Sequence, residues 1–302
     1  MAKIGIVTVL YNSESVLEDF FKTLNEQTYK DFVLYLVDNN SKDNGVELGK
    51  KLENNVSFEC KWLIQKENGG VAKGNNIGIC AALNDHCEYI LLSNNDIYLE
   101  KDAIEKLLDG MLVNEFTMAV PKIYYWNTDK LIWTAGGGFK WIQNVTFHRG
   151  DGEKDRGQFD KTSKIDYAPT CFMLIKASVF DKVGFMDEKY FVYFDDTDFI
   201  WRATKYENEI LGYVYDSLIW HKVSSCTGGR LSDFSLRYLN RNHIYFTFKH
   251  IRRFHLWIVL LYLFVHFCIR KPFFYDKKQM CIILSSYNEG WNTYKLHKRD
   301  CK

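Results

Sequence analysis

The sequence predicts an α/β fold built on a Rossmann-like, mostly parallel sheet with helices on both faces. Apolar runs of strand length begin at Ile4, Phe32 and Ile90, and each run stops abruptly in polar residues. Such runs, bounded by turn residues, are typical of strands buried in a parallel sheet. Helical segments separate them, and the resulting β-α-β-α-β-α-β order implies right-handed crossovers within one doubly wound sheet.

The remaining elements of the first half follow in order. A helix with one apolar face is expected after the first strand, and Ser15 and Glu18 have the spacing of a capping box at its start. The later elements are a polar helix over about Asn44–Glu53, a strand over Lys61–Ile64 and a small-residue helix ending near Leu83.

The second half is harder to interpret from sequence. We expect a helix around Leu107–Met111 and a turn or flexible point at Gly136–Gly138, and an exposed loop over Gly150–Lys164 that can become ordered when substrate binds. The expected strands are Thr117–Val120, Ala168–Ile175 and Ile210–Tyr215.

Composition limits the class of protein. The 302 residues carry a net charge of +1 and are 47% hydrophobic, which fits a folded globular chain. The eight cysteines include no CxxC pair, which favours reduced thiols in a cytosolic compartment. Met1 leads directly into a core-like strand, so no signal peptide is expected. The charge is uneven, because the segment from Leu236 to Lys302 is strongly basic.

Three strand ends carry polar side chains, at Tyr11–Asn12, Asp38–Asn40 and Asn94–Asp96. Ligands of open α/β sheets bind beyond the carboxyl ends of the strands, so one site at this edge explains all three. Asp96 offers hard oxygen ligands suited to Mg²⁺ or Mn²⁺. Turn chemistry, which also favours Asn and Asp, is the alternative for each end separately. Neither a GxGxxG fingerprint nor a phosphate-loop motif is present, which argues against a dehydrogenase or a P-loop NTPase.

Three segments carry a specific resemblance: Val7–Asn12 (VTVLYN), Val37–Ser41 (VDNNS) and Glu67–Gly78 (ENGGVAKGNNIG). They resemble the N-terminal half of the family-two inverting glycosyltransferases, and most closely the rhamnosyltransferase-like branch. The resemblance implies a GT-A fold, a nucleotide-diphosphate sugar donor and a divalent metal.

The resemblance also assigns candidate residues. Asp38 matches the carboxylate that contacts the nucleobase, and Lys73 is placed near the diphosphate, although a solvated helix charge is the alternative. Asp96 matches the last acid of the family's D-x-D metal motif, and His221 is placed to complete the metal site. Asn94 replaces the first acid, which weakens the expected metal affinity. The other donor-binding candidates are Thr8, Tyr11, Asn12, Asn40, Asn68, Gly69, Asn75 and Asn95.

The most specific match is an acidic cluster. Gly184–Phe191 (GFMDEKYF) and Tyr193–Arg202 (YFDDTDFIWR) resemble the family's G-F-x-D-E and E-D-x-D-x-x-x-R signatures. The resemblance makes Asp196 the general base, which takes the proton of the acceptor hydroxyl. Asp195 stands where Glu is commoner and is expected, as the second catalytic candidate, to order the site or the acceptor. Arg202 can simply pair with the third acid, Asp198.

The tail has a different character. Phe254–Cys268 is apolar and aromatic but only fifteen residues long, which is shorter than a membrane span of about 20 residues. Basic residues flank it: Lys249, Arg252 and Arg253 before it, and Arg270, Lys271, Lys277 and Lys278 after it. We expect a monotopic anchor on a membrane surface. A helix packed on the catalytic domain is the competing interpretation.

The sequence therefore predicts an inverting, metal-assisted hexosyltransferase. Residues 1–235 form a GT-A catalytic domain, with a nucleotide-sugar half (1–115) and an acceptor half (116–235), and residues 236–302 a helical tail. The expected donor is dTDP-rhamnose or a UDP-hexose, and the acceptor a bacterial surface glycan or lipid-linked saccharide at the inner face of the cell membrane. No nucleic-acid partner is expected. The alternatives are a sugar-nucleotide pyrophosphorylase and a non-catalytic nucleotide-sugar-binding protein.

Overall fold

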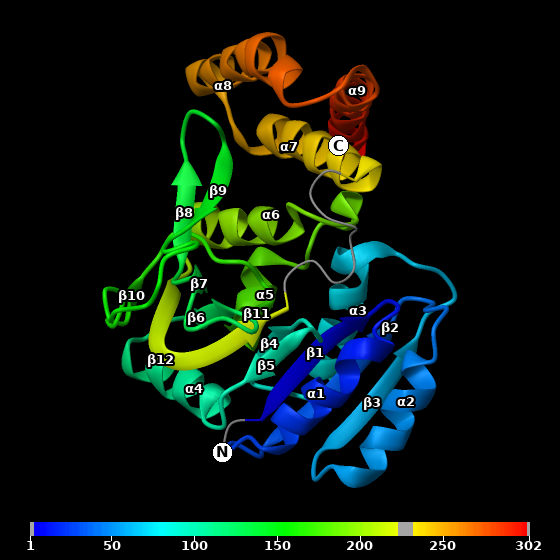
Figure 1. Ribbon diagram of the computed structural model, residues 1–302, viewed down its shortest axis with the longest axis vertical. Helices are drawn as coiled ribbons and strands as arrows, with labels where there is room; N and C mark the ends of the chain where they lie inside the picture. The colour runs from blue at the N-terminus through cyan, green and yellow to red at the C-terminus, as the bar shows by residue number, and fades with distance from the viewer. Residues whose placement is uncertain (1–2, 223–231, 301–302) are drawn as a thin grey trace.

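The computed structural model describes residues 3–222 and 232–300, and its body is one ten-stranded sheet (Figure 1). The strand order is β10-β12-β6-β11-β4-β1-β2-β3, with β5 paired to β12 and β7 paired to β6. Met1, Cys226, Cys301 and the side chains of Arg253 and Arg270 lie outside the described residues, so expectations that involve them stay untested.

The first half matches the predicted α/β order closely. Strands β1 (Ile4–Leu10), β2 (Phe32–Asp38), β3 (Glu59–Ile64) and β4 (Tyr89–Ser93) are parallel. Between them lie α1 (Glu14–Asn25), α2 (Gly45–Leu52) with the short η1 (Glu53–Asn55), and α3 (Gly70–Asn84).

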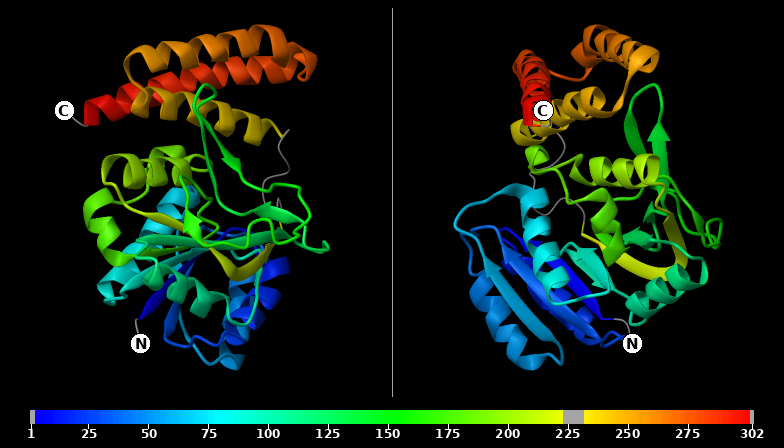
Figure 2. Two further views of the ribbon diagram at one scale, coloured as in Figure 1. Left: turned by 90° about the vertical axis from the view of Figure 1, so that its left-hand side faces the viewer. Right: turned by 180° about the vertical axis from the view of Figure 1, so that it is seen from behind.

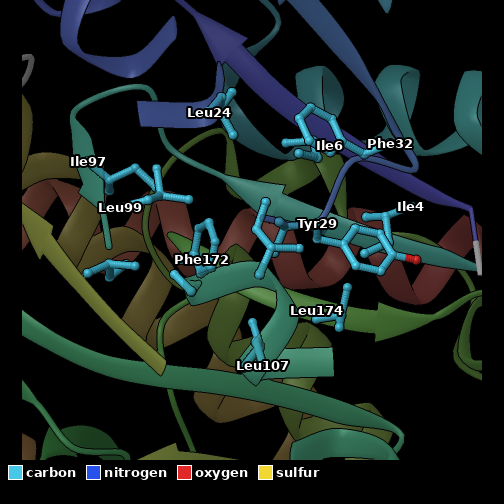
Figure 3. Close-up of a cluster of buried hydrophobic side chains, with 14 of the residues drawn as sticks. Ile4, Ile6, Leu24, Tyr29, Phe32, Ile97, Leu99, Leu107, Phe172 and Leu174 are labelled. Atoms are coloured by element: carbon cyan, nitrogen blue, oxygen red, sulfur yellow. The ribbon is translucent and has the colours of Figure 1, made fainter. Parts of the chain in front are cut away.

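Alternate residues of these strands enter two cores on opposite faces. Ile4, Ile6 and Leu91 pack with α1 and with α4 (Ala103–Val113), and Figure 3 shows part of this cluster. Val7 and Ile90 pack with α3 on the other face. Because β1, β2 and β4 are buried on both faces, these three strands are largely apolar, which is why the sequence indicates them so clearly, whereas the edge strand β3 is partly exposed and includes Glu59 and Lys61.

The second half adds strands of mixed direction. β11 (Phe172–Lys176) runs antiparallel between β4 and β6 (Met118–Tyr125), and β12 (Leu211–His221) runs parallel to β6. The smaller elements are β5 (Ile97–Leu99), β7 (Ile132–Thr134), β8 (Gly137–Lys140), β9 (Val145–His148), β10 (Ser163–Lys164), α5 (Ala177–Val183), η2 (Glu188–Tyr190), α6 (Asp195–Trp201) and η3 (Arg202–Tyr206).

Three local expectations are wrong. The helix α1 begins at Glu14, and its N-cap Ser13 makes no side-chain cap, so Ser15 and Glu18 form no capping box. Gly137 and Gly138 belong to strand β8 rather than to a turn, because β9 approaches so closely that a Cβ on Gly137 would lie 2.0 Å from the Phe147 carbonyl oxygen. β12 continues past Tyr215 to His221, since a register break between Val214 and Leu218 interrupts the pattern without ending the strand.

The segment Gly150–Lys164 is mostly irregular, as expected, but a buried ion pair holds it. Lys122 of β6 is 2% exposed, and its ammonium lies 2.8 Å from Asp155 of this loop. Lys122 also pairs with Asp160. Burial opposes ionisation, yet the hydrogen bonds from Lys122 and Tyr124 lower the pKa of Asp155 to about 2.

Three helices form a layer over the end of the α/β body, beside the hairpin of β8 and β9 (Figure 2). They are α7 (Asp233–His250), α8 (Arg253–Val265) and α9 (Lys277–Asp300). A short π-helix, η4 (His266–Arg270), and a short 3-10 helix, η5 (Lys271–Phe273), follow α8. α9 lies close on α7, because Gly290 leaves room for the Arg241 carbonyl. The helical stretch Phe254–Phe273 is long and apolar enough to cross a membrane by length and composition, and only 18% of it is buried.

Candidate functional site

Hydrogen bonds join the ends of the three strands at which the sequence predicts a site. The Asn95 amide after β4 donates to the Val9 carbonyl of β1 at 2.8 Å. The Asn12 side chain after β1 accepts from the Lys42 backbone N–H at 2.8 Å, beyond the end of β2. The polar residues of β1, β2 and β4 are therefore neighbours at one edge of the sheet.

Within this group, two buried polar groups have few partners. The Thr8 hydroxyl is fully buried and has no hydrogen-bond partner among the residues that the structure describes. The Asp38 carboxylate is 3% exposed and, within the described part of the chain, accepts only long hydrogen bonds, of 3.3 and 3.4 Å, from the Ser41 N–H. Tyr11 is 41% exposed, and Asn40 accepts a 2.9 Å hydrogen bond from Lys42.

The turn that begins α3 supplies the other expected donor residues. Asn68 accepts a 2.9 Å hydrogen bond from the Gly70 N–H, and Gly69 is the N-cap residue. Lys73 forms a 3.1 Å ion pair with the exposed Glu67. Asn75 points inward, with its amide 3.5 Å from the sulfur of Met186.

Strand register brings Asp96 and His221 together. Asp96 precedes β5, which pairs antiparallel with the end of β12, so Ile97 lies opposite His221. The Asp96 Oδ1 and His221 Nε2 atoms are 3.1 Å apart, and His221 Nδ1 is buried with no hydrogen-bond partner in residues 3–222 and 232–300. The Asn94 amide is 3.5 Å from the same Nε2.

The donor set of this pair suits a divalent cation. Neighbouring ligands of an octahedral ion with ~2.1 Å bonds lie ~3 Å apart, close to the separation of these two atoms. In the part of the chain that the structure describes, no three His, Cys, Asp or Glu side chains gather as a metal site. An ion held by Asp96 and His221 therefore needs amide, substrate or water oxygens as its other ligands.

The acidic cluster lies at the start of α6, and its acids have different environments. Asp196 is partly exposed, and it accepts hydrogen bonds from the Tyr167 hydroxyl at 2.7 Å and the Thr197 N–H at 2.6 Å. Asp195 is 5% exposed, and burial, with the neighbouring charge of Asp196, raises its pKa to about 8. Burial therefore favours the neutral form of the Asp195 carboxyl beside Asp196.

Asp198 has a structural environment. It is fully buried and lies 2.8 Å from Arg202, 2.6 Å from Lys249 and 2.7 Å from His250. Burial opposes its ionisation, but these partners hold its pKa far below the usual range. The expected pairing of Arg202 with Asp198 is confirmed.

A continuous series of contacts connects Asp96 with Asp196. The ring centroids of His221 and Trp133 are 4.6 Å apart, those of Trp133 and His148 are 4.8 Å apart, and those of His148 and Tyr167 are 6.2 Å apart. The Tyr167 hydroxyl then donates to Asp196. Burial raises the pKa of the Cys171 thiol, and the charges of both Asp96 and Asp196 add to the effect. Both carboxylates therefore act electrostatically on the same buried thiol.

Sequence reasoning missed the residues that make this connection. Trp133, His148, Tyr167 and Cys171 come from three separate segments of the second half of the chain: β7, β9 and the segment that leads into β11. No motif marks them, because β7, the β8–β9 hairpin and β11 bring them together only in the folded chain.

The fold and the site define a class: an α/β protein of the GT-A type, with a polar site at the carboxyl edge of its parallel strands. The family model named "Glycosyl transferase family 2" matches residues 5–184, so the chain belongs to glycosyltransferase family 2.

Relatives with curated descriptions agree with that family. The low-salt glycan biosynthesis hexosyltransferase Agl10 of Haloferax volcanii is 24% identical over 69% of this chain and 64% of its own length. The glycosyltransferase GlyG of Streptococcus pneumoniae is 25% identical over 62% of this chain and 61% of its own length. An uncharacterized glycosyltransferase of Haemophilus influenzae is 30% identical over 39% of this chain and 46% of its own. The chain thus matches about half to under two thirds of the length of these relatives.

Solved structures share the fold. S. aureus TarS has a TM-score of 0.63 at 16% identity, covering 96% of this chain and 49% of TarS. Residues 1–349 of TarS in complex with UDP-GlcNAc give a TM-score of 0.62 at 15% identity, covering 97% of this chain and 81% of that one. At this identity the likeness establishes the GT-A fold alone.

Proposed function

We propose that this chain is an inverting glycosyltransferase that moves a sugar from a nucleotide-diphosphate donor to a hydroxyl of a glycan or lipid-linked acceptor. The observation that carries the proposal is the series of contacts between the Asp96–His221 pair and Asp196, beside the joined ends of β1, β2 and β4. The donor is a UDP-hexose or dTDP-rhamnose, the latter as in the rhamnosyltransferase-like branch. UDP-GlcNAc in a TarS structure and the hexosyltransferase name of Agl10 favour the UDP-hexose.

The donor lies at the strand ends in this proposal. Asp38 and Thr8, with their poorly satisfied buried oxygens, take the nucleoside, because a bound base or ribose would supply the missing hydrogen bonds. When the donor binds, Lys73 leaves its ion pair with Glu67 and contacts the diphosphate. The other proposed donor contacts are Tyr11, Asn12, Asn40, Asn68, Gly69, Asn75, Asn94 and Asn95.

Asp96 and His221 would hold a Mg²⁺ or Mn²⁺ ion. When bound, such an ion offsets the negative charge that develops on a departing diphosphate. The chain's own contribution is to hold the two ligands at the correct separation through the pairing of β5 with β12.

Asp196 is the proposed general base. It accepts the proton of the acceptor hydroxyl while the new C–O bond forms at the anomeric carbon and the bond to the diphosphate breaks on the opposite face, which inverts the configuration. Asp195, whose pKa is raised by burial and by the charge of Asp196, orders the site or the acceptor. The Tyr167 hydrogen bond orients the Asp196 carboxylate.

An Asp196→Asn variant tests the proposal against a panel of UDP-hexoses and dTDP-rhamnose with Mn²⁺. Donor affinity, measured by calorimetry, should be retained, while sugar transfer falls about 100-fold or more. Unchanged transfer would remove Asp196 from its role. The replacement at Asn94 favours a second candidate, a non-catalytic nucleotide-sugar-binding protein; wild-type chain that binds a donor but transfers no sugar would support it.

The proposal also places the chain on an anionic membrane surface in the cytoplasm. Phe254, Trp257, Leu261 and Phe264 form a stripe along α8 and are 64–76% exposed, whereas Val259 and Leu263 on the other side are buried. The tip of the β8–β9 hairpin extends the stripe, because Trp141, itself 56% exposed, stacks on His255 at 4.1 Å. From Arg252 to Tyr275 the sequence has no acidic residue, which favours anionic lipid. One face of α8 thus packs on the protein and the other is free to bind lipid.

Vesicle flotation tests the membrane proposal with the full chain. Leu261→Glu/Phe264→Glu should abolish binding to vesicles containing phosphatidylglycerol, because two charges would enter the apolar stripe. Leu112→Glu, at a 53% exposed position on α4, is the matched control and should still float. Equal binding by both variants would rule out α8 as the lipid-binding surface.

A further inference from the structure

The loop just before the acidic cluster has a strained backbone. Phe191, Tyr193 and Phe194 have φ angles of 66°, 63° and 65°, in the left-handed region that residues with a Cβ rarely adopt. Phe194 is the N-cap of α6, so the strained backbone sets the direction in which Asp195 and Asp196 leave the loop. Strain of this kind persists only where surrounding contacts over-determine the conformation.

Helix α7 supplies those contacts through backbone carbonyls. The Asn242 side chain is fully buried, and its amide nitrogen lies 2.9, 2.7 and 2.9 Å from the carbonyl oxygens of Tyr190, Val192 and Tyr193. Arg241 donates to the preceding carbonyl, that of Lys189, at 2.7 Å, and also donates to the Asn242 side-chain oxygen at 2.7 Å. The second contact fixes the orientation of the amide.

The Phe191 carbonyl, between those that Asn242 holds, is bound by helix α3 instead. The Phe191 carbonyl accepts a 2.6 Å hydrogen bond from the Val71 N–H, and a Cβ on Gly70 would lie 2.3 Å from that oxygen. Gly70, with a φ of 85°, can adopt this turn because it has no side chain. Five consecutive carbonyls, from Lys189 to Tyr193, are therefore held from outside the loop.

Side chains of the same loop also pack on α7. The Phe191 ring lies 5.2 Å from that of Tyr238, and the Phe194 ring lies 5.6 Å from that of His243. The Tyr193 hydroxyl is 3.0 Å from that of Ser235. A buried Asn in a helix interior is costly unless its amide is satisfied, and here the loop satisfies it.

We propose that Asn242 and Arg241 of α7 position Asp196 for proton transfer by holding the strained loop Lys189–Phe194. This inference rests on the proposed role of Asp196 as the base. If α7 holds this loop, the helix contributes to the reaction by positioning Asp196, although most of α7 lies in the predicted tail, which begins at residue 236. The division of the chain into domains itself stays a prediction.

The test is a double-mutant cycle on the full chain. Asn242→Ala should lower kcat about 10- to 100-fold with donor KM changed less than about threefold, because a small displacement of the base affects the chemical step most. In an Asp196→Asn background, the same substitution should lower kcat less than about twofold, since no base remains to be misplaced. Asn240→Ala is the matched control. The Asn240 amide donates to the Leu236 carbonyl within α7, and its side-chain oxygen accepts from Lys271, so neither contact reaches the loop. This variant should leave kcat unchanged in both backgrounds.

The possible outcomes are distinguishable. An equal loss in both backgrounds would mean that Asn242 acts through general stability, which overturns the inference and leaves Asp196 as the base. Unchanged transfer in Asp196→Asn alone would overturn the proposed function and the inference with it. If Asn242→Ala does not fold, Arg241→Lys replaces it. That variant keeps the charge but loses the hold on the Lys189 carbonyl, and it should give the same pattern with a smaller loss in kcat.

Discussion

A series of side-chain contacts through Trp133, His148 and Tyr167 connects the Asp96–His221 pair with Asp196, but different structural elements fix the positions of the two carboxylates. The position of Asp96 follows from strand register, since β5 pairs with the end of β12 inside the main sheet. The position of Asp196 follows from the strained loop before α6. Asn242 of α7, about fifty residues further along the chain, holds this loop by donating hydrogen bonds to the loop's backbone carbonyls. Damage to α7 should therefore disturb the base while leaving the Asp96–His221 pair intact.

The largest effect is expected on the free energy of unfolding, from the buried ion pairs of Asp198 beside the strained loop. Asp198→Ala leaves Arg202, Lys249 and His250 without their common partner in the interior. Breaking a buried ion pair in this way should lower the free energy of unfolding by about 3–5 kcal/mol. Chemical denaturation measures it. Asp129→Asn removes an exposed pair with Lys154 and should leave the free energy of unfolding nearly unchanged. Similar losses in the two variants would show that the buried network is not needed for stability.

The pH dependence of stability sharpens the comparison at Asp195. Below pH ~4 the carboxyl is protonated in both the folded and the unfolded chain. As the pH rises, the unfolded chain releases this proton, but the folded chain keeps it until about pH 8. The stabilisation from the raised pKa is thus fully present at low pH and is lost progressively up to about pH 8.

Asp195→Asn should remove this dependence, because an amide stays neutral throughout. The urea midpoint of the variant, relative to wild type, should therefore rise between pH 5 and pH 8.5. Asp166→Asn, at an exposed pair with Lys205, should keep a constant difference from wild type over the same range. A constant difference for Asp195→Asn as well would mean that Asp195 ionises normally in the folded chain.

The two sides also differ in how far the sequence predicts them. The ends of β1 and β2 were predicted to within a residue, because strands buried on both faces are apolar throughout. The polar strand ends were predicted as one site for the same reason, since parallel strands finish at one edge. These are local signals, and they are enough to predict that the ends of these strands lie together, while the donor contacts proposed there stay a prediction.

The base side depends on contacts between distant residues. Tyr167 and Asp196 are 29 residues apart, and Asn242 lies 50 residues beyond Val192, so no local pattern relates them. Gly137 shows the limit well. The sequence indicates a turn or flexible point at Gly136–Gly138, whereas a glycine is needed at position 137 because β9 approaches so closely. The sequence suggested which loop carries the acids and not what holds that loop.

The smallest effect is expected on the metal side, and it tests whether Asp96 is independent of α7. His221→Ala should weaken Mn²⁺ binding at least about 10-fold in calorimetry with UDP present, because it removes one of the two proposed ligands. His148→Ala is the matched control: it contacts the same Trp133 ring at 4.8 Å, but it is not a proposed ligand, so its Mn²⁺ affinity should match wild type. Asn242→Ala should also bind Mn²⁺ normally, since the pairing of β5 with β12 does not involve α7. If Asn242→Ala weakened Mn²⁺ binding as much as His221→Ala does, the two carboxylates would share one support, and the contrast between register and strained loop would be wrong.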